Sequence, residues 1–255
     1  MSYVRVTVEG LVGRITLARP EKKNALNREM AEELATALFA LSEGPARVVA
    51  IDADGADFCA GADLAALNSM LDAPRQEHLE DAKALGHVFH TIRRMGKPVV
   101  AVVRGRAFAG GAGLATACDI VLAHEGARFA YPEVTLGFVP AMVMTMLRRS
   151  VGEKQAFDLV STGRVLTAEE AKSIGLVSRV FADMEFERLA EAALKQLAES
   201  PPQAMAATKT LFYQLDMLPF LEGITTGIVA NANARATSEF REGMQRFNSR
   251  KQDKE

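Results

Sequence analysis

Residues 104–119 read RGRAFAGGAGLATACD, and this stretch decides the fold. It follows the apolar run Val99–Val103, which is typical of a buried strand, and it leads through small residues into a short helix. Gly110 and Gly111 remove side chains at the helix start, so backbone N–H groups can approach a ligand oxygen with the positive end of the helix dipole behind them. The same glycines would also allow close packing of the helix on the strand, so this segment alone supports both interpretations.

A dinucleotide-binding loop is a rival interpretation, because Gly111, Gly113 and Thr116 come close to the Gly-x-Gly-x-x-Gly spacing. The third position is threonine, and the helix before the next strand is much too short for a dinucleotide-binding unit of about 30 residues. The chain also has no Gly-Lys-Ser or Gly-Lys-Thr phosphate loop. These departures argue against a nucleotide cofactor.

A second loop of small residues, Phe58–Leu64 with the sequence FCAGADL, follows the apolar strand Val48–Ile51. This loop also exposes backbone beside a helix start, and Asp63 suits the N-cap of that helix. Two such loops from adjacent strand ends can converge on one oxygen atom. The pair is therefore much stronger evidence for a binding site than either loop alone.

The first half of the chain alternates strands and helices, and the second half is helical. Hydrophobic periodicity predicts a hairpin and then a helix capped by Asn27, and the run Val48–Ile51 is typical of a strand buried on both faces of a parallel or mixed sheet. From about Met142 onward the pattern is almost entirely helical. The expected strands lie at residues 4–8, 15–17, 48–51, 99–103, 120–122 and 129–133.

The composition of the 255 residues excludes several function classes. Lys plus Arg number 30 and Asp plus Glu 32, a net charge of −2 without a basic stripe, so no nucleic-acid partner is expected. The longest stretch without a charged residue, Val134–Leu147, is shorter than the roughly 20 apolar residues that cross a bilayer, so no membrane span is expected. Cys59 and Cys118 alone cannot form a disulfide framework or a metal cluster, which predicts a cytoplasmic location and no metal site.

Beyond the two loops, the chain carries an ordered set of motifs that resembles the crotonase family, also called the enoyl-CoA hydratase/isomerase superfamily. The resemblance covers nearly the whole chain. Its motifs are Arg19-Pro20 with Asn24–Asn27, the loop Phe58–Leu64, the segment Gly105–Asp119, Pro132-Glu133 with Leu136-Gly137 and Pro140, and the block Thr167–Val177.

The resemblance implies an α/β fold in two parts. Residues 1–195 would form a spiral of repeated ββα units with an acyl-CoA site, and residues 196–255 a helical region used for trimer formation. The implied partner is an acyl-CoA thioester, whose coenzyme A is part of the substrate, so no separate cofactor is expected. The implied assembly is a homotrimer or a dimer of trimers.

The resemblance also assigns binding residues. The backbone N–H groups of Ala62 and Gly110 would hold the thioester oxygen and stabilise the enolate that forms on it. The adenine end of coenzyme A would meet the backbone of the first loop at Ala60, Gly61, Asp63 and Leu64. Basic residues that could meet its phosphates are Lys22, Lys23, Arg250 and Lys251, although surface charge alone also explains each of them.

Proton transfer is where the chain departs from the hydratase pattern of two glutamates. The first of these positions is Gly113, and Glu133 occupies the second. A buried glutamate beside an apolar acyl chain would have a raised pKa and could act as acid and base in turn, which makes Glu133 the expected catalytic residue. Otherwise Glu133 is a structural carboxylate, and the rival acid Asp119 is expected to be a hydrogen-bonded structural residue.

A second departure follows Pro140, where the family often has glycines and this chain has the methionine-rich run 141–146. These methionines either shape an acyl pocket or pack in a helix core. The polar stretch Asn68–Asp81 is expected to form a mobile rim over the pocket. One of its acids, such as Glu77 or Glu80, could replace the missing glutamate.

The resemblance therefore implies an enoyl-CoA hydratase that adds water to the 2,3 double bond of a trans-2-enoyl-CoA. One alternative is an enoyl-CoA isomerase in which Glu133 alone moves a proton from one carbon to another. The other is a catalytically silent acyl-CoA binding protein, which Gly113 favours and Glu133 opposes.

Overall fold

A six-stranded sheet forms the centre of the molecule, and the computed structural model describes residues 2–252, with side chains up to residue 249. All neighbouring strands run parallel except the N-terminal hairpin, which pairs antiparallel. The predicted hairpin and mixed sheet are therefore confirmed. In spatial order the strands are β1 (Val4–Glu9), β2 (Val12–Leu17), β3 (Val48–Ala53), β4 (Val99–Val103), β6 (Ile120–His124) and β9 (Arg179–Phe181).

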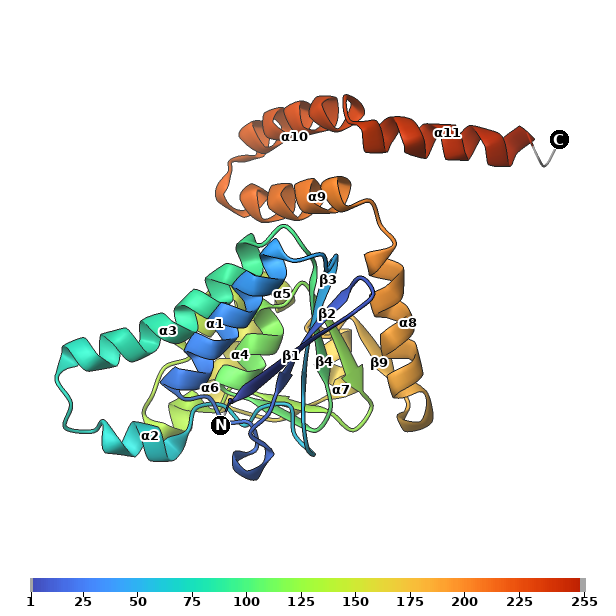
Figure 1. The fold of residues 1–255 in the computed structure, drawn as a ribbon. Coiled ribbons are helices and arrows are strands. Elements are labelled where there is room, and N and C mark those ends of the chain that lie inside the picture. Colours follow the sequence, from blue (N-terminus) through green and yellow to red (C-terminus); the bar gives the residue numbers. More distant parts are fainter. Residues whose placement is uncertain (1, 253–255) are drawn as a thin grey trace.

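Pairs of strands followed by a helix repeat along the chain, as β1-β2-α1, β4-β5-α4 and β6-β7-α5 (Figure 1). The second strands of the last two units join a separate small sheet made of β5 (Arg106–Phe108), β7 (Arg128–Ala130) and β8 (Leu166–Thr167). This arrangement agrees with the predicted ββα units. The helices of the body are α1 (Arg28–Glu43), α2 (Leu64–Ser69), α3 (Arg75–Arg94), α4 (Gly110–Ala117), α5 (Ala141–Val151), α6 (Glu153–Thr162), α7 (Ala168–Ser173) and α8 (Phe186–Ala198).

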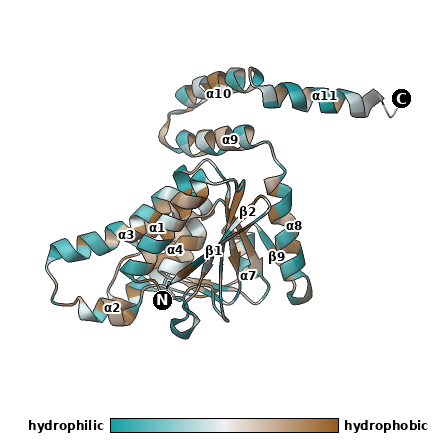
Figure 2. Cartoon of the chain, viewed as in Figure 1, coloured by the Kyte–Doolittle hydropathy of each residue, from teal (hydrophilic) through white to brown (hydrophobic). Residues whose placement is uncertain are grey.

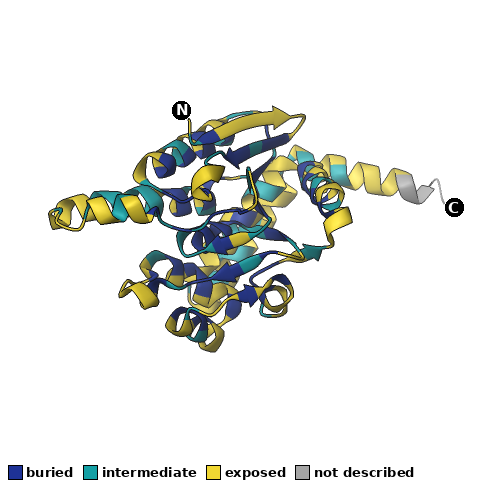
Figure 3. Ribbon diagram, turned by 90° about the horizontal axis from the view of Figure 1, so that it is seen from below, coloured by how far each residue is buried: buried dark blue, intermediate teal, exposed yellow. Residues whose placement is uncertain are grey.

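Both faces of the central strands β3 and β4 are covered, which is why these strands are largely apolar, whereas the edge strand β1 is mostly exposed (Figures 2 and 3). Successive residues of β3 point to opposite faces. Val49 and Ile51 join the core beneath α1 and α3, whereas Val48 and Ala50 join a second core beneath α8. Asn27 caps α1 by accepting a hydrogen bond from the Met30 amide at 3.0 Å, as its position predicted.

One sequence prediction in this region is wrong. The expected strand 129–133 ends at Ala130, and Glu133 instead begins a short 3-10 helix, Glu133–Leu136. Pro132 has no N–H to continue a strand ladder, which explains the early end. The chain after Met142 is mostly helical, as predicted, although the short strand β9 forms the edge of the large sheet beside β6.

Three C-terminal helices extend away from this body (Figure 1): α9 (Pro202–Gln214), α10 (Phe220–Arg235) and α11 (Ser238–Gln252). The expected boundary at residue 195 falls inside α8, about one turn before that helix ends. The two-part organisation of the chain stays a prediction. No helix among residues 2–252 combines the length and the apolar character that a membrane crossing requires.

A buried charge network attaches α9 to the body. The Lys209 ammonium lies 2.7 Å from an Asp119 carboxylate oxygen and also donates to the carbonyl oxygens of Ile92 and Lys97. Asp119 accepts two more hydrogen bonds, from the Tyr213 hydroxyl at 2.6 Å and the Val99 amide at 2.6 Å. The expectation that Asp119 is a hydrogen-bonded structural residue is thus confirmed.

Removing one partner of this network should destabilise the protein. Lys209→Ala leaves the Asp119 carboxylate buried without its cation, so we expect the free energy of unfolding to fall by about 3 kcal/mol. Urea denaturation would measure the change. Lys83→Ala is the control, because Lys83 forms an exposed pair with Glu80 and its loss should cost less than about 1 kcal/mol. Equal effects of the two substitutions would contradict the anchoring role.

Candidate active site

The two glycine-rich loops lie side by side. The Cys59 amide donates to the Arg106 carbonyl at 2.9 Å, and the Phe108 amide donates to the Cys59 carbonyl at 3.0 Å. Residue 59 thereby pairs with Ala107 of β5 as in a parallel sheet. The structure thus brings together the two segments that the sequence singled out.

Glycines permit this close approach. A Cβ atom at Gly111 would lie 2.3 Å from the Cys59 carbonyl oxygen, and one at Gly61 would lie 2.8 Å from the Ala109 Cβ. Gly61 also has a φ of +99°, which side-chain-bearing residues rarely adopt. The packing interpretation of these glycines is therefore correct, and the same packing positions the backbone groups of both loops.

The amides of Ala62 and Gly110 are free to bind a ligand. Leu26 donates to the Gly61 carbonyl at 2.7 Å and accepts from the Asp63 amide at 2.8 Å, so the N–H of Ala62, which lies between them, points away from Leu26. Gly110 is the first residue of α4, where an N–H has no partner within the helix. Within the described residues, neither amide donates a hydrogen bond to the protein.

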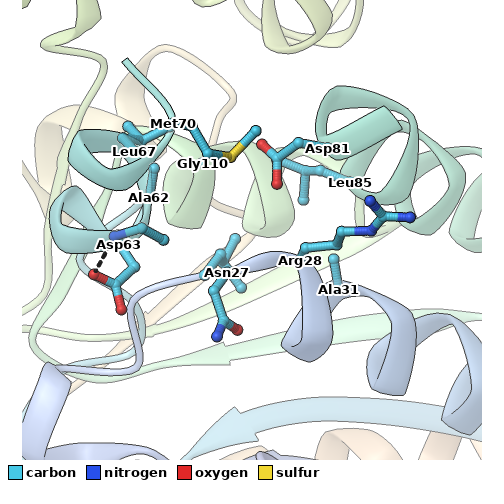
Figure 4. A pocket seen from close by; sticks show the side chains of 12 residues that line it. Asn27, Arg28, Ala31, Ala62, Asp63, Leu67, Met70, Asp81, Leu85 and Gly110 are labelled. Atoms are coloured by element: carbon cyan, nitrogen blue, oxygen red, sulfur yellow. Dashed lines mark hydrogen bonds between the residues drawn. The ribbon is translucent and has the colours of Figure 1, made fainter. Parts of the chain in front are cut away.

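A small cavity of about 70 Å³ lies beside these two residues (Figure 4). Its other walls come from Arg28 and Ala31 on α1, Leu67 on α2 with Met70 directly after it, and Asp81 and Leu85 on α3. A space of this size holds only a few heavy atoms, so most of an acyl-CoA would have to lie outside it.

Asp63 borders the same cavity and holds its loop in place. Its carboxylate accepts from the Ala65 and Ala66 amides at 2.9 and 3.3 Å, which confirms it as the cap of α2, and it forms an ion pair with Arg19 at 2.7 Å. Burial opposes its ionisation, but the Arg19 guanidinium and the two amides outweigh burial and hold the pKa of Asp63 below its usual value.

Glu133 lies apart from the residues that border the cavity, at the start of the 3-10 helix that follows β7. The same segment reaches the site through Ala130, whose carbonyl accepts from the Ala109 amide at 2.8 Å. Glu133 is 7% exposed, and its Oε2 atom has no hydrogen-bond partner among the described residues. Burial raises the pKa of the Glu133 carboxyl above its usual value, as expected for a proton-transferring group.

Apolar side chains occupy the space next to Gly113, one turn after Gly110 on α4. A Cβ at this position would lie 2.6 Å from Val143 Cγ2 and 3.2 Å from Phe89 Cζ. Val143 belongs to the methionine-rich run, which forms α5, and Met146 of that run is buried in the core. Gly113 therefore leaves no room for a second glutamate unless Val143 moves.

The acid that reaches the cavity from the polar stretch 68–81 is Asp81, which the sequence analysis did not single out. Glu77 is exposed, and Glu80, which is partly exposed, pairs with Lys83 at 2.9 Å. Asp81 lies four and eight residues before Leu85 and Phe89, on the apolar face of α3. An acid at an apolar position of the helical period is the signal that could have identified it.

The remaining predicted binding residues lie around the first loop. The Ala60 amide donates to the Lys23 carbonyl at 3.0 Å, so this loop lies next to the exposed lysines Lys22 and Lys23. Leu64 is 63% exposed. The side chains of Arg250 and Lys251 lie outside the described residues.

Comparisons with known proteins agree with this geometry. The sequence model of the enoyl-CoA hydratase/isomerase family matches residues 7–254. The chain belongs to the enoyl-CoA hydratase/isomerase family. A Thermus thermophilus protein that carries an enoyl-CoA hydratase name is 40% identical over 240 residues, 94% of this chain and 95% of its own. The 2,3-dehydroadipyl-CoA hydratase of Escherichia coli is 34% identical over 250 residues, 97% and 96% of the two chains.

A solved structure confirms the predicted crotonase fold. The crystal structure of an enoyl-CoA hydratase/isomerase (crotonase) from Legionella pneumophila matches with a TM-score of 0.91 and 32% identity, covering 98% of this chain and 97% of its own. As a member of this family, the chain is an enzyme of the enoyl-CoA hydratase or isomerase type.

The contact between the loops can be tested through the glycine pair. Gly111→Ala places a Cβ against the Cys59 carbonyl, so we expect the free energy of unfolding to fall by about 1–3 kcal/mol. Gly110→Ala is the matched control, because its Cβ would lie at ordinary contact distances of 3.5 and 3.7 Å from Leu26 and Leu85. Denaturation curves should show the first variant clearly less stable than the second; the reverse order would contradict this packing.

The burial of Glu133 predicts a pH-dependent stability difference. The folded protein raises the pKa of this carboxyl above its ordinary 4.5, so the fold loses stability as pH rises above 4.5, and the loss is complete once pH passes the folded pKa. Glu133→Gln should therefore gain stability relative to the unsubstituted protein as pH rises above 4.5, and the gain should then level off. Urea denaturation across this range, with the exposed Glu153→Gln as control, would measure the gain. A difference that does not change with pH would contradict the assignment.

Proposed function

We propose that this chain is an enoyl-CoA hydratase that adds water to the 2,3 double bond of a trans-2-enoyl-CoA. The observation that carries the proposal is the pair of amides at Ala62 and Gly110, which border one cavity and donate to no acceptor among the described residues. Such donors stabilise an oxygen on which negative charge develops, and losing one typically costs about 10²–10³-fold in rate. The hydratase names of the relatives support water addition as the reaction.

Glu133 supplies the proton in this proposal. Its burial favours the neutral carboxyl, which can donate to C2 of the substrate while water bonds to C3. The electrons of the double bond pass through an enolate, whose oxygen the two amides hold. The unpaired Oε2 atom supports this role, because a buried acceptor without a partner is costly in a purely structural residue.

Isomerisation is the second candidate function, and the apolar filling around Gly113 favours it. With no second glutamate on α4, Glu133 could remove a proton at C2 of a 3-enoyl-CoA and return it at C4. This reaction needs one carboxylate and no water.

The coenzyme A portion of the bound substrate would extend out of the cavity along the first loop. It would pass the backbone of Ala60 and Gly61, with Asp63 and Leu64 beside it. The exposed position of Lys22 next to this loop suits contact with a phosphate group. The cytoplasmic location expected from Cys59 and Cys118 stays a prediction.

The proposed assembly is a homotrimer or a dimer of trimers. Its support is the apolar surface of the C-terminal helices, since large exposed apolar patches commonly mark interfaces between chains. Exposed apolar side chains on these helices include Phe212, Phe220, Leu221, Ile224, Ile228 and Phe247.

Glu133→Gln tests the proposed function. The substitution keeps the size of the side chain but removes the transferable proton, so we expect kcat for hydration to fall by about 10²–10⁴-fold while acyl-CoA binding is retained. Mass spectrometry of short, long and branched trans-2-enoyl-CoAs in oxygen-labelled water would detect product formation, and Glu153→Gln should behave like the unsubstituted protein.

The possible results separate the candidate functions. Label uptake by the unsubstituted protein and its loss in Glu133→Gln would support the hydratase. If no substrate gains water but a 3-enoyl-CoA is converted to its 2-enoyl isomer, the protein is an isomerase. Binding without either reaction would point to the silent acyl-CoA binding protein.

A further inference from the structure

Asp81 brings a carboxylate into the cavity that holds the two free amides. It lies on α3, one turn before Leu85, whose Cδ2 atom is 3.7 Å from the position of a Cβ on Gly110. Figure 4 shows its carboxylate pointing into the space between Met70, which follows α2, and Leu85. The cavity is thus bordered by two amide donors from one side and by one acid from the other.

Among the described residues, no group forms a hydrogen bond or an ion pair with this carboxylate. Asp81 is half-buried, yet it forms no hydrogen bond or ion pair with the side chains and backbone that the structure describes. Burial raises the pKa of Asp81, Glu29 of α1 raises it further, and Arg28 of α1 and His78 of α3 lower it. Arg28 itself donates to Glu32 rather than to Asp81. An acid that is partly desolvated and unpaired inside a cavity is available to a ligand.

The environments of Asp81 and Glu133 differ in degree. Burial raises the pKa of both carboxyls above their usual values. Glu133 is only 7% exposed, whereas Asp81 is half-buried and the Arg28 guanidinium opposes the rise of its pKa. Of the two carboxyls, Asp81 is therefore the one better suited to act as the base.

We infer that Asp81 is the second acid–base group of the site and accepts the proton of the attacking water while Glu133 protonates C2. This inference rests on the proposed hydratase function and names the residue that stands in for the carboxylate missing at Gly113. It also explains how a chain whose α4 face is closed by Val143 and Phe89 could still activate water.

The proposed step balances. The water oxygen bonds to C3 as one of its protons passes to the Asp81 carboxylate, and the electrons of the 2,3 double bond move to C2 through an enolate held by Ala62 and Gly110. Glu133 gives its proton to C2. Asp81 is then neutral and Glu133 charged, and exchange of one proton with solvent restores both. Exchange of the C2 proton, by contrast, requires only Glu133 and the two amides.

Asp81→Asn separates these two reactions. The substitution is isosteric and removes no contact within the described protein, so folding should be unchanged. We expect kcat for hydration of a trans-2-enoyl-CoA to fall at least about 100-fold, because general-base catalysis typically contributes 10²–10⁴-fold. Exchange of the C2 protons of butyryl-CoA with deuterated solvent, followed by NMR, should stay within about threefold of the unsubstituted protein. Glu133→Gln should lose both reactions.

Glu80→Gln is the matched control, since Glu80 is the neighbouring acid on α3 but does not border the cavity and pairs with Lys83. It should change neither reaction. Hydration by Asp81→Asn within threefold of the unsubstituted rate would overturn the inference, as would an equal loss of hydration and proton exchange. If the Asp81 variant hydrates normally while Glu133→Gln does not, the inference fails and the hydratase proposal stands. If the unsubstituted protein hydrates no substrate, the hydratase proposal itself fails.

Discussion

Two hydrogen bonds between Cys59 and the backbone of β5 set the geometry on which the site depends. They join the loop after β3 to the second strand of the β4-β5-α4 unit at a distance that excludes side chains at Gly61 and Gly111. Because both loops are fixed to each other as paired strands, their free amides face one cavity without any side chain having to orient them. Preorganisation of this kind costs no rearrangement when charge develops on a bound oxygen.

Helix α4 divides the space around the site. Its first residue, Gly110, faces the cavity, and the residue before it, Ala109, has a φ of +47°, a conformation that is uncommon for a residue with a side chain. One turn later, Gly113 contacts Val143 and Phe89 instead of solvent. The helix therefore has a free amide at Gly110 and apolar neighbours one turn later at Gly113. A second acid for the site must come from a different element.

The sequence predicted the features that local chemistry determines. Glycine pairs, the caps Asn27 and Asp63 and the buried strand β3 each depend on a few adjacent residues, and the structure has all of them. Two elements were not predicted. Strand β9 depends on pairing with the distant strand β6, and the 3-10 helix at Glu133 depends on Pro132 ending the preceding strand. The helical period places Asp81 on the apolar face of α3, but the period alone does not specify that this face borders the cavity, because that depends on how α3 packs beside α4.

Two enclosed carboxylates, Asp119 and Glu133, differ in how completely the protein satisfies them with hydrogen bonds. Asp119 receives an ammonium, a hydroxyl and an amide, so its charge is fully compensated and serves to anchor α9. Glu133 is more enclosed than Asp119, yet one of its oxygens has no partner among the described residues. An unsatisfied buried polar atom lowers the stability of a protein by about 1–3 kcal/mol. If Glu133 were only structural, we would expect both of its oxygens to have hydrogen-bond partners, as those of Asp119 do. This contrast supports a role for the Glu133 carboxyl in contacting a substrate rather than in stabilising the fold.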